Sequence, residues 1–325
     1  MRILIWHVHG SWTTSFVQGP HDYLLPVNDV RDADGLGRAR TWTWPASVVE
    51  LPVVELRRAE FDLVVLQRPH ELDMVERWTG KKPGYDVPAL YVEHNTPGGG
   101  VPRTQHPLYD QDRIPVIHVT HFNRLMWDCG AAPTFVIEHG IVDPGYQYTG
   151  EVNRAAVAVN DPVRRGRAVG TDLLPVLAAE APLDVFGMRV DRLPEHLRLD
   201  ESRLRTVDDL PQSLLHGELA RRRVYLHTAR WTSLGLSLLE AMHLGMPVVA
   251  LATTEATRAV PPEAGVVSSD PEELAAAARH FLDNRELARA TGHRAREAVL
   301  SRYSLARFIS DWDSALERQH GLVGR

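Results

Sequence analysis

The sequence contains very little cysteine and lysine and has no long uninterrupted apolar run. Cys129 is the only cysteine among 325 residues, which excludes an internal disulfide or a multi-cysteine zinc site and fits a reducing compartment. No segment approaches the roughly 18 consecutive apolar residues of a membrane helix. The N-terminal MRILIWHVHG has the pattern of a strand rather than of a signal peptide. We therefore expect a cytoplasmic protein without a transmembrane segment.

Basic residues are not gathered into any long positive run. Lys81 and Lys82 are the only lysines, and the longest arginine run is residues 221–223. The formal net charge is −6, with 44% of residues hydrophobic and 24% charged. This is the composition of an ordinary globular protein, and it gives no general attraction to polyanions. We therefore expect no nucleic-acid partner, and the length suits two domains.

Short aliphatic runs recur along the chain at the spacing of strands that are separated by helices or loops. The runs are continuous rather than alternating, which is typical of parallel strands covered by helices on both faces. They are RILIW, FDLVVLQ, PALYVEH, PVIHVTH and TFVIEHG, followed by AAVAVN, LDVFG, RVYLHT, PVVAL and AGVVSS. Asp143, Pro144, Gly145 and Gly150 interrupt the pattern between these two groups. The sequence therefore predicts two α/β halves with a boundary near residues 143–153.

Two helices near the C-terminus carry clear signals. Asp270 is a suitable N-cap before Pro271 and two glutamates, so a helix is predicted to continue through LAAAARHFLDN. The segment YSLARFISDWDSAL has an apolar stripe at helical spacing. The stripe consists of Leu305, Phe308, Ile309, Trp312 and Leu316. Because such a stripe must pack on another surface, we expect this helix to cross back to the first domain.

The stretch RWTSLGLSLLEAMHLGMPVVA, residues 230–250, has the pattern of a loop, a short helix and a strand. In parallel α/β sheets, ligands bind beyond the carboxyl ends of the strands. The loop would present backbone N–H groups at the start of the helix, which suits a diphosphate, and Glu240 could accept hydrogen bonds from a ribose diol. Alternatively, Ser237 and Glu240 form a capping box. The loop residues concerned are Thr232, Ser233, Leu234, Gly235 and Leu236.

The same stretch, followed by AGVVSSDPEELAAAARHFLDNRELARATGHRAREAV, resembles the C-terminal domain of retaining GT-B glycosyltransferases of glycosyltransferase family four. VIEHGIVD at 136–143 is similar to the strand and turn that close the N-terminal domain in that family, where VIPNGID is usual. VGTDLLPVLAAEAPLDVFG at 169–187 resembles its first C-terminal helix and next strand. The resemblance covers roughly residues 116–315; before that it rests mainly on strand order and His94.

This resemblance implies an α/β protein with the GT-B fold, in which two Rossmann-like domains with parallel sheets face each other across a cleft. Residues 1–145 would form the N-terminal acceptor domain, residues 146–303 the C-terminal nucleotide-sugar domain, and residues 304–325 a helix that crosses back. The implied activity is transfer of a sugar from a nucleotide-diphosphate donor to an unknown acceptor with retention of configuration. We expect no metal or cofactor, because fixed cations and backbone N–H groups can stabilise the departing phosphate.

Several site residues follow from the resemblance. The family has two glutamates eight residues apart; Glu240 matches the second, which binds the donor ribose, whereas the first falls on Thr232. His94 matches a strand-end position that lines the reacting face of the sugar. Gly10 and Ser11 follow the first strand, where the family usually brings a glycine close to the donor phosphates. Gly10 also has a structural interpretation, because a tight turn from strand to helix needs a glycine.

The diphosphate-neutralising Arg-x4-Lys pair of the family is altered in this sequence. With residues 170–172 placed on the KGxD motif of the family, Arg164 takes the arginine position and Val169 takes the lysine position. Arg165 or Arg167 could replace the missing cation, since guanidinium groups bind phosphate in a bidentate manner. The expected donor-binding cations are therefore Arg164 and Arg165.

Two other functions are compatible with part of the sequence. A non-catalytic nucleotide-sugar-binding or partner-binding relative is one, because Thr232 and Val169 remove two charges that the family uses. A metal hydrolase is the other, because His7 and His9 form a His-x-His pair after the first strand. The histidines that could add ligands are His94, His118, His121 and His139. However, the strand count falls short of an eight-fold barrel and the only lysines lie in a loop, so we expect no metal site.

Overall fold

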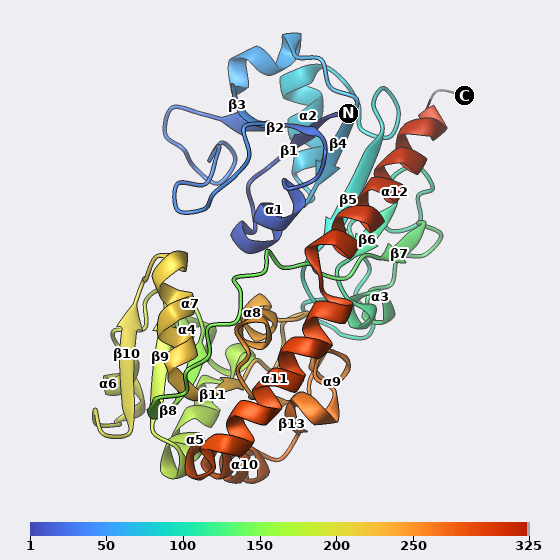
Figure 1. Cartoon of the computed structure of the whole chain (residues 1–325). Coiled ribbons are helices and arrows are strands. Elements are labelled where there is room, and N and C mark those ends of the chain that lie inside the picture. The colour runs from blue at the N-terminus through green and yellow to red at the C-terminus, as the bar shows by residue number, and fades with distance from the viewer. Residues whose placement is uncertain (324–325) are drawn as a thin grey trace. The chain divides into compact units, whose positions relative to one another are not determined.

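The computed structural model describes residues 1–323, and the chain divides into two compact units. Unit 1 comprises residues 1–142 together with the segment that begins at residue 305, and unit 2 comprises residues 143–304. Each unit contains one parallel sheet with helices packed against it (Figure 1). This is the Rossmann-like α/β architecture that the aliphatic runs predict for both halves.

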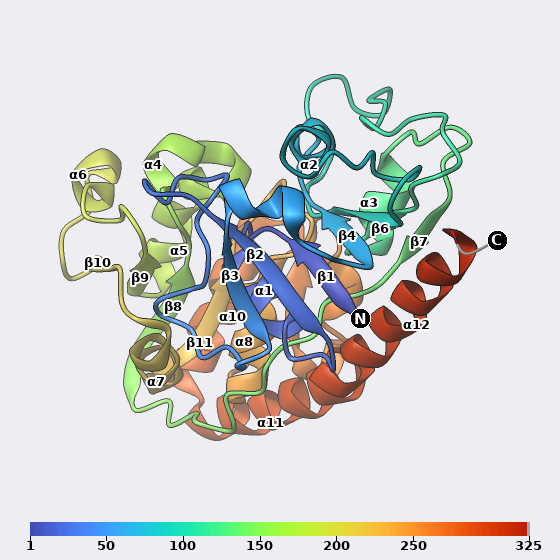
Figure 2. The same cartoon turned by 90° about the horizontal axis from the view of Figure 1, so that it is seen from above.

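Unit 1 contains a seven-stranded parallel sheet in the order β3-β2-β1-β4-β5-β6-β7. Figure 2 shows β3, β2, β1 and β4 side by side in this order. The strands are β1 (Arg2–Ile5), β2 (Asp22–Val27), β3 (Val48–Pro52), β4 (Leu63–Leu66), β5 (Ala89–Glu93), β6 (Val116–His118) and β7 (Thr134–Val136). The helices are α1 (Gly10–Phe16), the 3-10 helix η1 (Val53–Arg58), α2 (Glu71–Thr79), α3 (His121–Met126) and α12 (Leu305–Val323).

Helix α12 packs on unit 1 against α1 and β5. The ring of Trp312 meets those of Trp12 and Phe16 edge-on, at centroid distances of 5.6 and 5.0 Å. The helix also lies against the chain that follows β7, because a Cβ atom on Gly140 would be 2.2 Å from Cβ of Phe308. Only glycine allows this approach. The buried members of the apolar stripe are Phe308, Trp312 and Leu316.

Unit 2 contains a six-stranded parallel sheet in the order β10-β9-β8-β11-β12-β13. Its strands are β8 (Val152–Ala158), β9 (Leu183–Gly187), β10 (Leu204–Asp208), β11 (Arg222–His227), β12 (Val248–Leu251) and β13 (Gly265–Ser268). Its α-helices are α4 (Pro162–Arg165), α5 (Leu174–Glu180), α6 (Leu193–Leu197), α7 (Gln212–Arg221), α8 (Leu236–Leu244), α9 (Ala256–Ala259), α10 (Pro271–Asp283) and α11 (Arg285–Arg302). Its 3-10 helices are η2 (Gly166–Val169), η3 (Thr171–Leu173) and η4 (Pro262–Ala264). One face of the sheet is covered by α5 and α10, and the other by α7, α8 and α11.

The helix predicted from its N-terminal signals is confirmed as α10. The side chain of Asp270 accepts a hydrogen bond of 2.9 Å from the backbone N–H of Glu272, and Pro271 occupies the first position of the helix. The cap satisfies a donor that would otherwise have no partner within the helix. The apolar side of α10 then packs into the core of unit 2, where Leu274, Ala278 and Phe281 are buried.

The aliphatic runs missed three strands, β2, β3 and β10. Strands β3 and β10 lie at sheet edges, and in each only the first residue is buried, so neither has a continuous apolar run. Edge strands tolerate polar residues because one side of the strand needs no partner. In β2, which lies between β3 and β1, Pro26 breaks the apolar run after Leu25.

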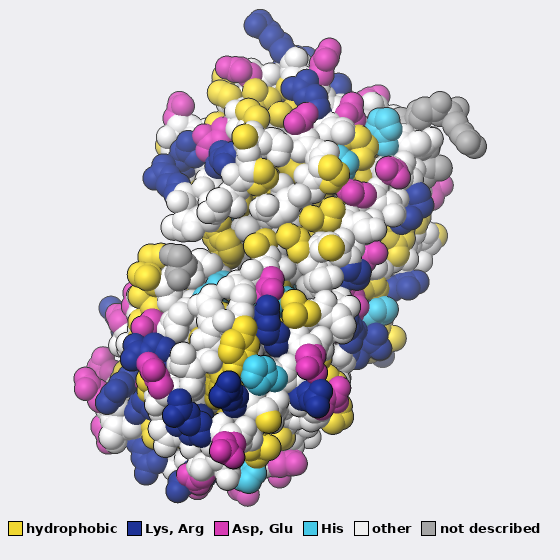
Figure 3. Space-filling model, in the orientation of Figure 1, with side chains coloured by type: hydrophobic (Ala, Val, Ile, Leu, Met, Phe, Trp, Pro, Cys, Tyr) yellow, Lys and Arg dark blue, Asp and Glu magenta, His cyan; other side chains and the backbone are white. Residues whose placement is uncertain are grey.

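The surface shows no large region of a single charge sign on the face drawn in Figure 3, where Lys and Arg side chains are interspersed with Asp and Glu. Among residues 1–323, no helix combines the length and the apolar character that crossing a membrane requires.

Candidate functional site

The loop between β11 and α8 makes a tight turn beside a buried histidine. His227 ends β11, and a Cβ atom on Gly235 would lie 2.5 Å from Cε1 of its ring. A side chain at Gly235 would therefore displace either the loop or the imidazole. Burial lowers the pKa of His227 to about 4, so the ring is neutral at physiological pH. Gly235 thus packs against an uncharged imidazole ring.

Helix α8 begins without a side-chain cap. Its N-cap is Gly235, and no side chain hydrogen-bonds there, so Ser237 is the second helical residue rather than the N-cap. The Oγ atom of Ser237 instead accepts a hydrogen bond of 2.8 Å from the hydroxyl of Tyr225. This start differs from a capping box, in which Ser237 would be the N-cap. The backbone N–H of Leu238 donates to the carbonyl of Gly235 at 3.0 Å, so the N–H groups that precede it in α8 are the candidates for binding an anion.

Glu240 lies in α8 and is buried, with 6% of its surface exposed. Its Oε2 atom is 3.7 Å from Nε2 of His216 in α7. His216 in turn is 2.7 Å from the amide nitrogen of Gln212. A carboxylate has two oxygens with several acceptor positions, so Glu240 can also accept hydrogen bonds from a polar ligand.

The hydroxyl of Thr232 occupies the position where the resemblance expects a glutamate. Its Oγ1 atom is buried and has no hydrogen-bond partner among the described residues. Within the same loop, the backbone carbonyl of Ser233 accepts from Glu255 N at 3.4 Å. Ser233 and Leu234 are buried, whereas Thr232, Gly235 and Leu236 are partly exposed. The Thr232 hydroxyl is therefore a polar group in the loop after β11 that makes no hydrogen bond to the described residues.

The loop after β11 is hydrogen-bonded to the segment 161–172, which contains the candidate arginines. The backbone N–H groups of residues 230 and 231 both donate to the carbonyl of Ala168, at 2.9 and 3.0 Å. The Thr228 hydroxyl donates to the carbonyl of Val169 at 2.8 Å. Gly170 has φ +77°, and a Cβ atom there would lie 2.1 Å from the carbonyl oxygen of Thr228. Unit 2 therefore brings the two donor-binding segments of the sequence analysis together.

The candidate arginines differ in how they are paired. Arg164 donates to Asp161 at 2.5 Å, and Arg167 donates to Asp172 at 2.7 Å. Arg165, in contrast, has no carboxylate partner among the described residues and reaches only a backbone carbonyl at 3.5 Å. The lysine position is taken by Val169, whose side chain is buried and supplies no charge. Arg165 is thus the arginine of this segment best able to bind a phosphate.

His94 directly follows β5 in unit 1 and is buried, with 8% of its surface exposed. Its Nε2 atom lies 3.0 Å from Oε1 of Gln67, and its ring is 4.1 Å from that of His9 and 4.9 Å from that of Trp12. Burial, together with the neighbouring His9 and His139, lowers the pKa of His94 well below its usual value. A neutral imidazole can hydrogen-bond a sugar hydroxyl but cannot neutralise a phosphate.

Gly10 and Ser11 begin α1, which has His9 as its N-cap and no side-chain cap. A Cβ atom on Gly10 would meet the indole nitrogen of Trp42 at 3.4 Å, an ordinary contact. Within unit 1, neither the backbone nor the packing therefore demands glycine at this position. The two residues keep their predicted role as candidates for contact with the donor phosphates.

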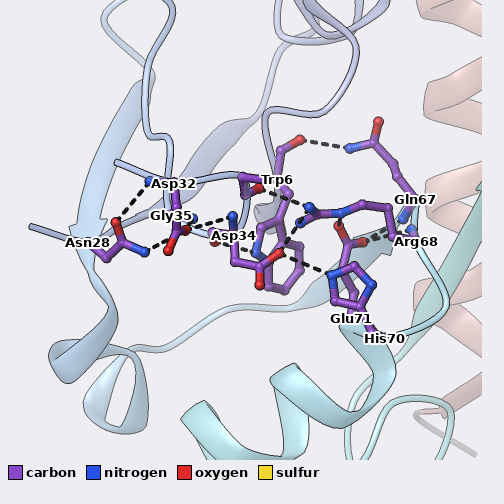
Figure 4. Close-up of polar contacts among 10 residues, drawn as sticks. Trp6, Asn28, Asp32, Asp34, Gly35, Gln67, Arg68, His70 and Glu71 are labelled. Carbon is purple, nitrogen blue, oxygen red and sulfur yellow. Dashed lines mark hydrogen bonds and ion pairs between the residues drawn. The ribbon is translucent and has the colours of Figure 1, made fainter. Parts of the chain in front are cut away.

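Polar residues after β4 form a network that the sequence analysis missed (Figure 4). Arg68 binds Asp34 at 3.0 Å and Glu71 at 2.7 Å, and so joins the chain after β2 to the start of α2. His70 also binds Asp34, at 3.0 Å. Burial raises the pKa of Glu71. The sequence contains the same pattern here as at His94: the polar stretch QRPHE directly follows the aliphatic run of β4.

The histidines considered as metal ligands do not converge. Within residues 1–323, no three His, Cys, Asp or Glu side chains are grouped so that they could hold a metal ion. His118 lies against Cys129 at 3.7 Å, and His7 binds the carbonyl of Gly37 at 3.2 Å.

A family model described as "Glycosyl transferase-like" matches residues 167–313. Sucrose-phosphate synthase from Thermosynechococcus elongatus superposes with a TM-score of 0.73 at 15% identity, covering 99% of this chain and 100% of that one. Anabaena HepE, in complex with UDP-glucose, has a TM-score of 0.73 at 15% identity, covering 98% and 100% of the two chains. AviGT4, a glycosyltransferase involved in avilamycin A biosynthesis, has a TM-score of 0.63 at 13% identity, covering 99% and 98%.

The chain has the GT-B fold. This confirms the fold class predicted from the resemblance, with Rossmann-like sheets of seven and six parallel strands. No curated protein matches the sequence. The GT-B assignment accordingly rests on the architecture, and the family-model match lies mostly in unit 2.

Proposed function

We propose that this protein is a retaining, metal-independent glycosyltransferase of glycosyltransferase family four, and that it moves a sugar from a nucleoside diphosphate donor to a hydroxyl acceptor. The observation that carries the proposal is that the loop after β11 is hydrogen-bonded to the segment 161–172, through residues 228, 230 and 231 to the carbonyls of Ala168 and Val169. The two segments lead to the N-terminus of α8, to the buried carboxylate of Glu240 and to Arg165, which has no carboxylate partner among the described residues. These are the groups that a nucleoside diphosphate requires.

The ribose and the diphosphate of the donor have candidate partners in unit 2. Glu240 accepts hydrogen bonds from the ribose diol, since a carboxylate has two oxygens and no proton to donate. The first backbone N–H groups of α8 and the guanidinium of Arg165 bind the diphosphate, with Arg164 beside them. UDP is the first nucleotide to test, because HepE is found in complexes with UDP and with UDP-glucose.

The reaction breaks the bond between the anomeric carbon and the phosphate oxygen and forms a bond between that carbon and the acceptor oxygen. The acceptor attacks from the face that the phosphate leaves, so configuration is retained. The proton of the acceptor hydroxyl passes to the departing phosphate. Negative charge grows on that phosphate in the transition state, and the fixed cation and N–H groups lower the barrier there. His94 binds the sugar through a hydrogen bond.

Unit 1 supplies the acceptor site in this proposal. The cytoplasm is the proposed location, and the single free cysteine, Cys129, fits a reducing compartment. In this proposal Arg165 and backbone N–H groups bind the diphosphate. They supply the positive electrostatic potential that a metal ion would otherwise supply, so no metal is needed.

The test is thermal unfolding in the presence of UDP, GDP, ADP, CMP and dTDP and their common sugars, with and without EDTA. A ligand at a hundred times its dissociation constant stabilises by about 2.7 kcal/mol, which shifts a melt by several degrees. We expect one nucleotide to raise the melting temperature to the same extent with EDTA. A shift that EDTA abolishes would overturn metal independence, and no shift with any nucleotide would overturn the donor site.

A non-catalytic nucleotide-sugar-binding protein is the second candidate. Two observations favour it: Val169 is buried and uncharged, and Thr232 presents a neutral hydroxyl. Both candidates require a nucleotide-dependent shift in melting temperature. Release of free nucleotide from a sugar nucleotide, followed by product formation with hydroxyl acceptors, would decide for the enzyme.

A further inference from the structure

We infer that Gln67 is a positioning residue that fixes the tautomer of His94, so that His94 meets its ligand as a hydrogen-bond acceptor through Nδ1. The assignment of the tautomer rests on unit 1 alone. The statement about the ligand rests on the proposed function, because it takes His94 as the residue that lines the sugar.

The direction of two hydrogen bonds follows from a backbone carbonyl. The Nε2 atom of Gln67 lies 2.7 Å from the carbonyl oxygen of Trp6, and a carbonyl only accepts. The amide group of Gln67 must therefore place its NH2 toward Trp6. Its Oε1 atom then faces Nε2 of His94 at 3.0 Å. Since Oε1 also only accepts, Nε2 of His94 must carry the proton.

The surroundings keep His94 neutral, so that a proton on Nε2 leaves Nδ1 with its lone pair. Gln67 is 3% and His94 8% exposed, and burial is the largest cause of the lowered pKa of His94. The titratable and charged groups around it are His9 and His139, with Arg68 acting on His9 and Arg307 on His139. Burial lowers the pKa of His9 to about 4 and that of His139 to about 3, and no carboxylate is among the groups that act on His94, so nothing there stabilises a protonated ring.

The tautomer restricts the chemistry of the ligand at this position. An acceptor nitrogen binds a hydroxyl group that donates, and it repels the lone pairs of a carboxylate or phosphate oxygen. A sugar hydroxyl that donates its proton fits this nitrogen. We expect the sugar to present a neutral hydroxyl to His94 rather than a uronate carboxylate.

Two substitutions separate positioning from a structural role. Gln67→Leu removes both hydrogen bonds and frees the His94 tautomer. Gln67→Glu keeps an acceptor for Nε2–H, and its charge raises the pKa of His94. Gln111→Leu is the matched control, because Gln111 also bonds several backbone groups, including the carbonyl of Ile114 at 2.8 Å. It lies before β6, at the opposite end of the sheet from His94.

The first readout is the nitrogen spectrum of the full-length protein labelled with 15N-histidine, with His94 assigned by the signal lost in His94→Gln. We expect a neutral His94 protonated at Nε2 in the wild type and in Gln111→Leu, and a mixture of tautomers in Gln67→Leu. A wild-type His94 protonated at Nδ1 would overturn the inference. This readout needs no donor, so it stays decisive even if the proposed glycosyltransferase activity fails.

The second readout is the pH dependence of kcat and KM for the donor that passes the melting test. We expect Gln67→Leu to lose about tenfold in kcat/KM, as for loss of one oriented hydrogen bond. Gln67→Glu should match the wild type at high pH and lose activity on the acid side, where its His94 becomes protonated and Nδ1 turns into a donor. A parallel loss in both variants without a new acidic limb would show that Gln67 is merely structural.

Discussion

Arg230 binds the carboxylate of Asp172 through two hydrogen bonds, 2.8 Å from Nη1 to Oδ1 and 3.2 Å from Nη2 to Oδ2. The same guanidinium also donates to the carbonyl of Arg167 at 2.6 Å. Burial opposes ionisation of Asp172, but the hydrogen bond and charge of Arg230 keep the pKa of that carboxyl below its usual value. Arg230 and Asp172 are therefore both charged, and their ion pair holds the loop after β11 against the segment 161–172.

Removing the Arg230–Asp172 ion pair should reduce the affinity for a nucleotide more than it reduces the free energy of unfolding. We expect Arg230→Gln to lower the free energy of unfolding by no more than about 1 kcal/mol, because the pair is partly exposed and screened. The affinity for the nucleotide should fall about fivefold, since the loop is no longer held in place. Isothermal titration and urea unfolding measure the two quantities. Arg279→Gln, which breaks an exposed pair with Asp283, is the control and should leave affinity unchanged.

Glu240 should contribute to nucleotide affinity rather than to stability. We expect Glu240→Gln to weaken nucleotide binding by about 1.5–3 kcal/mol, the usual value of a hydrogen bond to a charged group. The melting temperature without ligand should change little, because glutamine fills the same space. Calorimetric titration and a thermal melt check this. An early melt with unchanged affinity would mean that the carboxylate supports α8 and does not contact the ribose.

The packing of the segment 161–172 requires a glycine at position 170. We expect Gly170→Ala to destabilise unit 2 strongly, because the added Cβ would lie 2.1 Å from the carbonyl oxygen of Thr228. Gly166→Ala is the matched control: it has a left-handed φ of +47° but nothing within 4 Å of the added Cβ. The control should cost only the backbone strain, about 1–3 kcal/mol. Equal losses in urea unfolding would show that the contact with Thr228 is not rigid.

Buried neutral histidines should make the protein sensitive to mild acid. Burial lowers the pKa of His118 and His139 to about 3 and that of His227 to about 4. In the unfolded chain these groups titrate near pH 6.5, so between pH 6.5 and about 4 the unfolded state binds more protons. The free energy of unfolding should then fall by up to about 1.4 kcal/mol per pH unit for each histidine.

Urea unfolding at pH 7.5, 6 and 5 measures this slope. We expect His139→Gln to reduce the slope below pH 6.5, because one buried titrating group is removed. His139 is the sharpest choice, since both ring nitrogens are buried without a partner among the described residues. A slope that is the same in the variant would show that His139 binds a proton in the folded protein as readily as in the unfolded one.

Near the amino ends of β8, β9 and β11, unit 2 contains a buried ion cluster. Asp184 is 2% exposed and accepts hydrogen bonds from both Arg154 and Arg222, the latter at 2.8 Å. We expect Asp184→Asn to destabilise unit 2 by about 3–5 kcal/mol, because the buried guanidinium of Arg154 loses its counter-charge and that of Arg222 keeps only Glu218. Glu180→Gln, at an exposed pair with Arg279 on the same unit, should be nearly neutral. The free energy of unfolding of each variant checks both expectations.

The strands of the sheet interiors could be predicted from the sequence because burial on both faces demands apolar residues at every position. Strand β4 reads LVVL and is buried throughout. Strand β3 could not be found this way, since only its first residue is buried and it includes Glu50. The same physical reason hides β10 at the edge of the other sheet. Continuous apolar runs therefore predict the strands in the interior of a sheet, but they do not predict edge strands.

Only those parts of the candidate site whose residues lie close together in the sequence could be predicted from it. The Gly235 turn and Glu240 lie in one continuous stretch, so their proximity follows from helix geometry. Gln67 and His94 are 27 residues apart and meet because β4 and β5 are neighbours in the sheet. Such a pairing depends on strand order and register, which single residues do not encode. The partner of His94 therefore needed the structure.

Helix α12 makes unit 1 discontinuous along the chain, and this has a consequence for the order of folding during synthesis. Residues 143–304 are complete before Phe308 and Trp312 leave the ribosome, whereas Trp12 and Phe16 wait for those side chains to cover them. Domains usually fold in the order in which they are made. Here we expect the half that is translated second to reach its native state first, and the nascent N-terminal half to depend on protection of its apolar surface until the last helix arrives.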